Sequence, residues 1–162
     1  MKKESRGFSL IELLIVVAII LIIASIAIPN LLRSRMAANE ASAVGSLRSI
    51  NTAEIAYYTT YPSVGFSNLL SLGGSVATCA TATGAASTGA CLIDNVLAGG
   101  TKSGYIFTVT PSGSTPYVQY TSTGYAKVQG QSGQRQFCSD QSGVIRANAT
   151  AATCSTTTDN PI

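Results

Sequence analysis

The sequence predicts an α+β fold in which a long N-terminal helical spine packs against a small antiparallel sheet of three to four strands. Residues 8–28 form an almost wholly apolar run, and apolar positions recur every three or four residues over residues 29–61. Apolar and polar residues then alternate over much of residues 105–162, after a Gly-, Ser-, Ala- and Thr-rich loop at residues 62–104. A helical repeat followed by strand alternation is typical of a helix packed on a sheet.

The apolar run is long enough to cross a membrane. Phe8 to Ile28 is 21 residues, which at about 1.5 Å per residue covers a hydrocarbon core of roughly 30 Å. Fifteen of these residues are Phe, Leu, Ile or Val. Together they favour insertion by roughly 5 to 9 kcal/mol, against a cost of about 3 kcal/mol for an acid at the helix centre. Glu12 lies near one end of the run, so we expect a transmembrane helix despite its charge.

Basic residues at the start of the chain set the expected orientation of this helix. Lys2, Lys3 and Arg6 lie in the short N-terminal flank, which stays in the cytoplasm under the positive-inside rule. Arg33 and Arg35 follow the apolar run and weaken this signal without reversing it. The C-terminal part of the chain is therefore expected outside the cytoplasm.

A cleaved secretory signal peptide is an alternative interpretation of the same run. The apolar region of such a peptide spans about 7 to 15 residues and ends in an A-x-A-like site. The letters SIA at residues 25–27 imitate that site. The run in this chain is longer and carries Glu12 within it, which argues against a secretory signal peptide.

Composition argues against catalysis and against nucleic-acid binding. The chain has 10 basic and 7 acidic residues, a net charge of +3 and no histidine. Without histidine there is no Ser-His-Asp or Cys-His arrangement and no His-ligated metal. Electrostatic nucleic-acid binding needs clustered Lys and Arg, whereas the chain after the N-terminal flank is nearly neutral. We expect no enzyme activity, no cofactor and no specific nucleic-acid site.

Four cysteines, all in the second half of the chain, predict two disulfides. An even number of cysteines in a Ser/Thr/Gly-rich, exported region is typical of disulfides rather than of a metal site. Three pairings are possible, and four free buried thiols are the alternative. We favour the sequential pairing of Cys79 with Cys91 and of Cys138 with Cys154, because each pair brackets one local loop.

The first residues carry a resemblance to a known family. The stretch RGFSLIE places a basic leader ending in Gly7 before Phe8, then a carboxylate at Glu12 and an apolar helix. This stretch resembles the type IV prepilin signature, and the type IVa class more than IVb. The resemblance implies that a prepilin peptidase removes residues 1–7 by cutting after Gly7, and that the new amine of Phe8 is methylated. It also implies a homo-oligomeric helical filament in which Glu12 pairs with the Phe8 amine of a neighbouring subunit.

The function implied by this resemblance is that of a pilin. A precursor in the bacterial inner membrane is passed to the pilus assembly machinery and polymerised into an extracellular pilus for adhesion, motility or DNA uptake. One alternative is a type II secretion pseudopilin, which forms a short periplasmic pseudopilus. Another is an anchored binding module that never polymerises. For Glu12 alone, the alternative is a carboxylate that snorkels to the membrane surface.

Two prolines divide and end the helical spine. Pro29 lacks the N–H that an interior helical residue donates, so we expect a helix kink or a locally melted stretch over residues 21–29. Pro62 disfavours helix at Tyr61, so the helix that begins near Ser9 should end at Tyr61 or slightly before, at about Tyr58. The amphipathic part should bury one stripe: Ala43, Leu47, Ile50, Ala53, Tyr57 and Tyr61.

Alternating residues predict the strands of the sheet. The expected strands are residues 105–111, 117–128, 135–140 and 143–148. Because pseudopilins related to this family often hold calcium near the C-terminus, we considered Asp140 and Asp159 as ligands. Two carboxylates are too few for a hard-cation site, so no metal is predicted. The absence of a convincing calcium loop and the predicted disulfides favour a pilus over a pseudopilus.

Overall fold

A computed structural model describes residues 8–79, 85–149 and 154–162 of the chain. The chain divides into two compact units, Met1–Arg35 and Met36–Ile162. The α+β prediction is confirmed, since a long apolar N-terminal helix is followed by an antiparallel sheet.

Helix α1 spans Leu10–Thr60, 51 residues, and passes through both units. It ends at Thr60, one residue before Tyr61, as the position of Pro62 predicted. Pro29 lies inside the helix, and the backbone of residues 21–29 is helical throughout. The local melting considered for this stretch is therefore absent, although Pro29 still removes one backbone donor from the helix.

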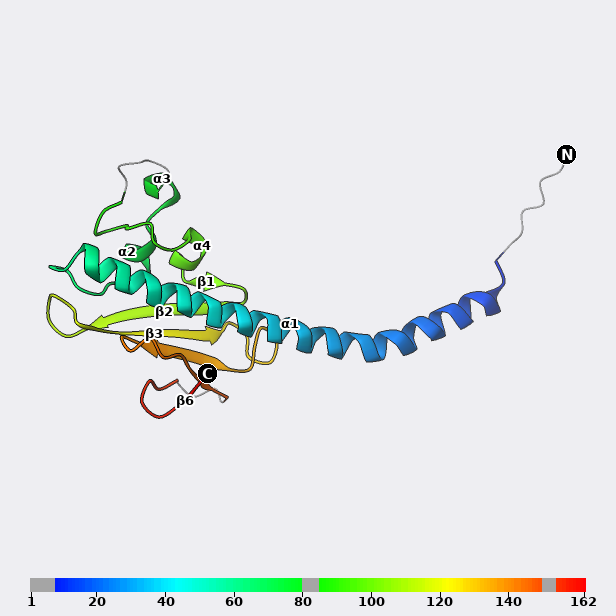
Figure 1. Ribbon diagram of the computed structural model, residues 1–162. Helices are drawn as coiled ribbons and strands as arrows, with labels where there is room; N and C mark the ends of the chain where they lie inside the picture. Colours follow the sequence, from blue (N-terminus) through cyan, green and yellow to red (C-terminus); the bar gives the residue numbers. More distant parts are fainter. Residues whose placement is uncertain (1–7, 80–84, 150–153) are drawn as a thin grey trace. The chain divides into compact units, whose positions relative to one another are not determined.

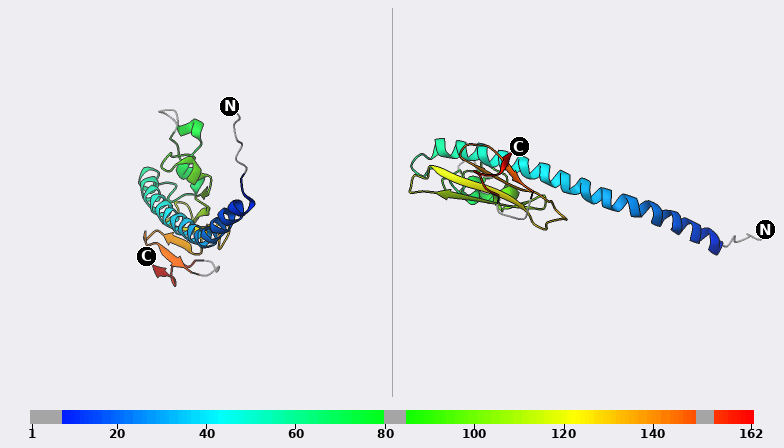
Figure 2. Two further views of the ribbon diagram at one scale, coloured as in Figure 1. Left: turned by 90° about the vertical axis from the view of Figure 1, so that its right-hand side faces the viewer. Right: turned by 90° about the horizontal axis from the view of Figure 1, so that it is seen from below.

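The second part of α1 supplies one side of the core of the second unit. The expected stripe is buried at five positions: Ala43, Leu47, Ile50, Ala53 and Tyr57. Tyr61 is only half-buried, because it lies after the helix has ended. Figures 1 and 2 show this part of α1 lying along one face of the sheet. The spacing of three and four residues thus places a single row of side chains against the strands.

Within the described residues the sheet has six antiparallel strands in sequential order rather than the expected three to four. The strands are β1 (Thr101–Lys102), β2 (Tyr105–Ser112), β3 (Gln119–Ala126), β4 (Gln136–Asp140), β5 (Arg146–Asn148) and β6 (Asn160–Pro161). The four predicted strands correspond to β2 to β5. The additional strands, β1 and β6, are each two residues long, so no alternation can reveal them.

Strands β2 and β3 form the longest pair and show the expected alternation. Tyr105, Phe107 and Val109 are buried on β2, and Tyr120 is buried on β3. Gly124 pairs with Phe107 across the two strands. A Cβ atom at position 124 would lie 3.0 Å from the Phe107 ring, so the absence of a side chain there gives the aromatic ring its place in the core.

The segment between helix and sheet contains more regular structure than the predicted loop. Its described residues, 61–79 and 85–100, form three short helices: α2 (Leu69–Gly73), α3 (Val76–Cys79) and α4 (Asn95–Ala98). Asn68 caps α2 by accepting from the Ser71 N–H, and Asp94 caps α4 by accepting from the Leu97 N–H. These helices are too short for a periodic pattern, but both caps are residue types that favour helix starts.

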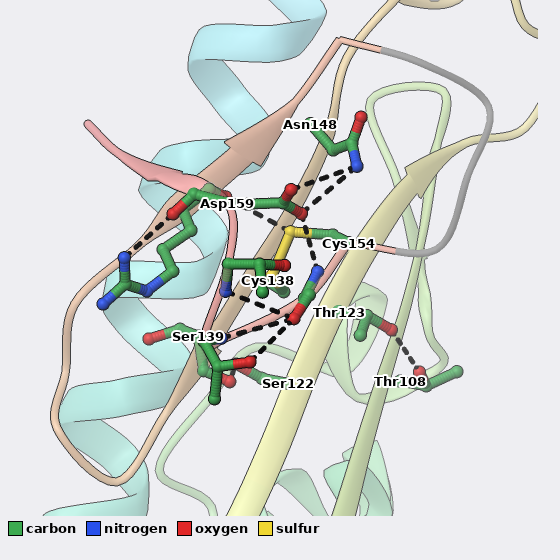
Figure 3. The surroundings of a disulfide bond; sticks show 12 residues. Thr108, Ser122, Thr123, Cys138, Ser139, Asn148, Cys154 and Asp159 are labelled. Carbon is green, nitrogen blue, oxygen red and sulfur yellow. Dashed lines mark hydrogen bonds between the residues drawn. A yellow bond between two sulfur atoms is a disulfide. The ribbon is translucent and has the colours of Figure 1, made fainter.

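Both disulfides have the sequential pairing that the sequence favoured. Cys79 is joined to Cys91 within the connecting segment, and Cys138 of β4 is joined to Cys154 of the C-terminal segment. Figure 3 shows the second bond between β4 and the C-terminal segment, beside Asp159. Cys138 is on the outer face of the sheet, where it pairs with Thr123 of β3. The second disulfide therefore fastens the C-terminal segment to that face.

Candidate membrane and assembly segment

The first unit presents an apolar surface all around its helix. Within α1 an 18-residue window has a mean hydropathy of 3.2, and none of that window is buried. Large exposed apolar side chains recur without a polar face from Leu10 to Leu32. A helix that is apolar on every side suits lipid or a bundle of similar helices. By length and composition, α1 can cross a membrane.

Phe8 and Glu12 lie at the start of this apolar surface. Phe8 precedes the helix and is 74% exposed. Glu12 is exposed in the first turn of α1, where a carboxylate interacts favourably with the N-terminal end of the helix dipole. Among the described residues, Glu12 has no ion-pair partner. Gly7, the expected cleavage residue, and the rest of the leader lie outside the described residues.

A buried carboxylate connects α1 to the β3–β4 connection in the second unit. Glu40 Oε1 accepts from the backbone N–H groups of Gln134 (2.8 Å) and Arg135 (3.2 Å), and its Oε2 accepts from Arg135 Nε at 2.8 Å. Burial would raise the pKa of Glu40, but these hydrogen bonds outweigh it and hold the pKa below its usual value. Glu40 thus stays charged and fixes the connection against the helix.

A second carboxylate of α1 is buried with fewer hydrogen-bond donors around it. Glu54 is fully buried, and its Oε2 accepts from the Ser67 N–H at 3.1 Å. Its Oε1 is buried without a partner in the part of the chain that the structure describes. Burial raises the pKa of Glu54 to about 7, despite the hydrogen bond from Ser67. This group changes charge near neutral pH.

Asn51 links the helix to two strands through buried polar groups. Its amide nitrogen donates to Ser139 Oγ at 2.8 Å, and its carbonyl oxygen accepts from the Tyr120 hydroxyl at 3.0 Å. Sequence reasoning missed Asn51 and Glu54 because it followed apolar positions only. Asn51 comes four residues after the buried Leu47, as Glu54 does after Ile50, and this spacing is the signal that both side chains face the sheet.

The two aspartates considered as calcium ligands accept hydrogen bonds from nearby backbone N–H groups and, for Asp159, also from Asn148 of β5. Asp140 Oδ1 accepts from the Ser142 N–H at 2.9 Å. Asp159 Oδ2 accepts from the Ser155 N–H at 2.7 Å, and both its oxygens accept from Asn148 Nδ2 at 3.2 Å (Figure 3). Asp159 lies close to the sulfur atoms of Cys138 and Cys154. Those sulfurs are joined to each other, so they are not thiolate ligands.

Comparison with known proteins finds similarity to a methylation motif and to two pilins. Residues 2–28 match the model of the prokaryotic N-terminal methylation motif. The chain is 44% identical over 56 residues to the type IV major pilin protein PilA of Myxococcus xanthus, covering 35% of this chain and 26% of that protein. It is 58% identical over 38 residues to the type IV wide pilus major component PilA4 of Thermus thermophilus, covering 24% and 29%. The chain is thus related to the type IV pilins.

The family model and the two pilins each match only part of the chain, and the model matches residues 2–28. The matches span less than a third of the two pilins. No solved structure matches the chain significantly. The methylation motif and the apolar helix together indicate membrane insertion of this pilin-related chain. The pilins it resembles are structural proteins.

Proposed function

We propose that the chain is a structural subunit of a type IV pilus. It is inserted in the inner membrane as a precursor and cleaved after Gly7 by a prepilin peptidase. It is then methylated at Phe8 and polymerised by the pilus assembly machinery into an extracellular helical filament. The observation that carries this proposal is the apolar surface around α1 from Leu10 to Leu32. This surface bears Glu12 in the first turn of the helix, and most of it lies within the matched motif at residues 2–28.

The apolar surface gives the filament its cohesion in this proposal. In the precursor this surface contacts lipid, and in the filament it contacts the same helix of neighbouring subunits. Cleavage after Gly7 creates a positive amine at Phe8 that would enter this apolar core. Glu12 of a neighbouring subunit supplies the counter-charge. Leaving one partner of a buried pair alone typically costs about 3 to 5 kcal/mol, so the pair selects the register in which both charges are matched.

The two units have separate roles in the proposed filament. Residues 8–28 insert in the membrane and then form the filament core, and the second unit is displayed outside it. The disulfides fasten the connecting segment at Cys79–Cys91 and the C-terminal segment at Cys138–Cys154. Closing a loop of about 15 residues stabilises a small domain by roughly 3 kcal/mol in the chain-entropy model. A subunit displayed outside the cell benefits from such constraints.

A pseudopilin of a type II secretion system is the alternative. Both relatives named above are pilus components, which favours the pilus. Imaging of filaments sheared from the cell surface, with mass spectrometry of their subunit, tests the proposal. We expect long surface filaments whose subunit begins with N-methylated Phe8. A subunit confined to the membrane and periplasm would instead support the pseudopilus, and an N-terminus at Ile28 would indicate signal-peptide cleavage.

A further inference from the structure

Two arginines follow the apolar part of α1 and lie within the first unit. Arg33 and Arg35 are both exposed. Neither forms an ion pair with any residue that the structure describes. Leu31 and Leu32, just before them, expose 56% and 42% of their surface. The helix surface therefore changes from apolar to basic within a few residues.

These arginines lie at or just beyond the outer edge of the headgroup layer along the helix, close enough for their side chains to reach back into it. Arg33 and Arg35 come five and seven residues after Ile28, which is about 7 and 10 Å along the helix axis. The headgroup layer extends roughly 5 to 7 Å beyond each side of the hydrocarbon core. Arginine side chains are long enough to reach back to phosphates while their stems lie on apolar surface.

The directions of the two side chains favour a bilayer over a single protein partner. Consecutive helical residues are about 100° apart, so Arg33 and Arg35 point to nearly opposite sides of α1. A protein docked on one face of the helix would meet only one of them. A headgroup layer surrounds the helix and meets both. Their charge also complements anionic phosphates, with which guanidinium groups form paired hydrogen bonds.

We propose that Arg33 and Arg35 form a basic collar that binds the phosphates of anionic phospholipids in the membrane leaflet facing away from the cytoplasm. This proposal rests on the membrane insertion that is part of the proposed function. The collar explains why two positive charges follow the apolar run although they weaken the positive-inside signal. It sets the depth at which the precursor rests, with Leu31 and Leu32 at the interface.

The experiment uses the absence of tryptophan from the chain. Leu32→Trp places a single fluorescent reporter next to the collar. The full-length chain is reconstituted in phosphatidylcholine vesicles that contain spin-labelled phosphatidylglycerol or spin-labelled phosphatidylcholine, with the nitroxide on the same acyl carbon. A parallel sample contains excess inorganic phosphate at matched ionic strength, which separates lipid binding from binding of free phosphate.

We expect phosphatidylglycerol to quench the tryptophan at least about twofold more strongly than phosphatidylcholine, since each arginine near the surface enriches anionic lipid up to about fivefold. Arg33→Gln with Arg35→Gln should bring the two lipids to equal quenching. Arg48→Gln is the matched control, because Arg48 is an exposed arginine of the same helix, 20 residues after Ile28. That variant should retain the preference, as should the sample with free phosphate.

Three results would overturn the collar: equal quenching by both lipids in the Leu32→Trp chain, a preference that survives the double variant, or a preference removed by free phosphate. Extraction with alkaline carbonate is done on every sample. Chain that resists extraction but shows no lipid preference contradicts the collar alone. Chain that is extracted, and whose tryptophan neither lipid quenches, contradicts membrane insertion and the proposed function with it.

Discussion

The Glu54 carboxylate accepts one hydrogen bond from the Ser67 backbone N–H, at 3.1 Å, while its other oxygen is buried without a partner in the described part of the chain. This pair joins α1 to the segment that leaves it. It also places a titratable group in a buried site that disfavours its charged form. The stability of the second unit should therefore depend on pH near neutrality.

Glu54→Gln should make the second unit more stable than the parent chain at pH about 8, and similar at pH about 5. The folded-state pKa of Glu54, about 7, lies above its ordinary value of 4.5. Stability from this group is thus fully present below about pH 4.5 and is lost as pH rises to about 7, by up to about 3 kcal/mol. Thermal unfolding of the full chain in detergent, followed by tyrosine circular dichroism, measures the difference.

Glu40→Gln is the matched control, with the opposite sign. The pKa of Glu40 is held below its ordinary value, so its contribution is present above about pH 4.5 and is lost as pH falls. We expect Glu40→Gln to lower stability at neutral pH. If both variants kept the parent's dependence on pH, neither carboxylate would control it.

The backbone N–H groups that bind Glu40 should matter more than its ion pair with Arg135. Glu40→Ala leaves the Gln134 and Arg135 N–H groups without their acceptor, which should cost roughly 1 to 3 kcal/mol. Arg135→Gln should cost under about 1 kcal/mol, because the Arg135 side chain is 47% exposed and exposed ion pairs contribute little. Urea unfolding at neutral pH gives both values, and a larger loss for Arg135→Gln would reverse this ranking.

Gly65 should be much harder to replace than Gly113. Its φ is +87°, and a Cβ atom there would lie 2.2 Å from the Tyr117 carbonyl oxygen. Gly113 has a similar φ of +100° but nothing within 4 Å of such an atom. Gly113→Ala should therefore cost about 1 kcal/mol from backbone strain alone. Gly65→Ala should cost clearly more, and equal melting temperatures of the two variants would contradict the close approach to Tyr117.

Peptide mapping without reduction should recover Cys79 linked to Cys91 and Cys138 linked to Cys154. Replacing either pair with alanine should lower stability by roughly 2 to 4 kcal/mol. The same unfolding experiment on the two double variants measures this. A cross-linked peptide containing Cys91 and Cys138 would refute the pairing, although it would leave the relationship to pilins intact.

The sequence predicted the parts of the fold that follow from periodicity. Leu47 and Ile50 belong to a repeat that only a helix against a core explains, and Phe107 belongs to a clear alternation. The polar interior was not predictable in the same way. Whether Asn51 can be buried depends on Tyr120, which is far away in sequence and reaches it only after folding. Strands as short as β1 and β6 form because the neighbouring strand has free backbone groups at its edge with which they can pair. No local sequence pattern predicts such a pairing.

The residues of the proposed assembly site could be identified from the sequence, but their contact cannot form within a single chain. Phe8 and Glu12 were singled out by their spacing, and the family motif covers both. Their proposed contact joins two subunits after cleavage, so one uncleaved chain holds only one side of it. The pairing stays a prediction, and its test has to be made on filaments.

The most direct test is the yield of surface filaments from Glu12→Ala cells, measured by immunoblots of sheared and membrane fractions. Membrane insertion and leader cleavage should be intact, because the apolar run outweighs one residue and the cut lies before Glu12. Filament yield should collapse, since each Phe8 amine would enter an apolar core without a counter-charge. Glu12→Asp should give an intermediate yield, because it keeps the charge on a shorter side chain. Normal filaments from Glu12→Ala would contradict the account and leave Glu12 as a carboxylate at the membrane surface.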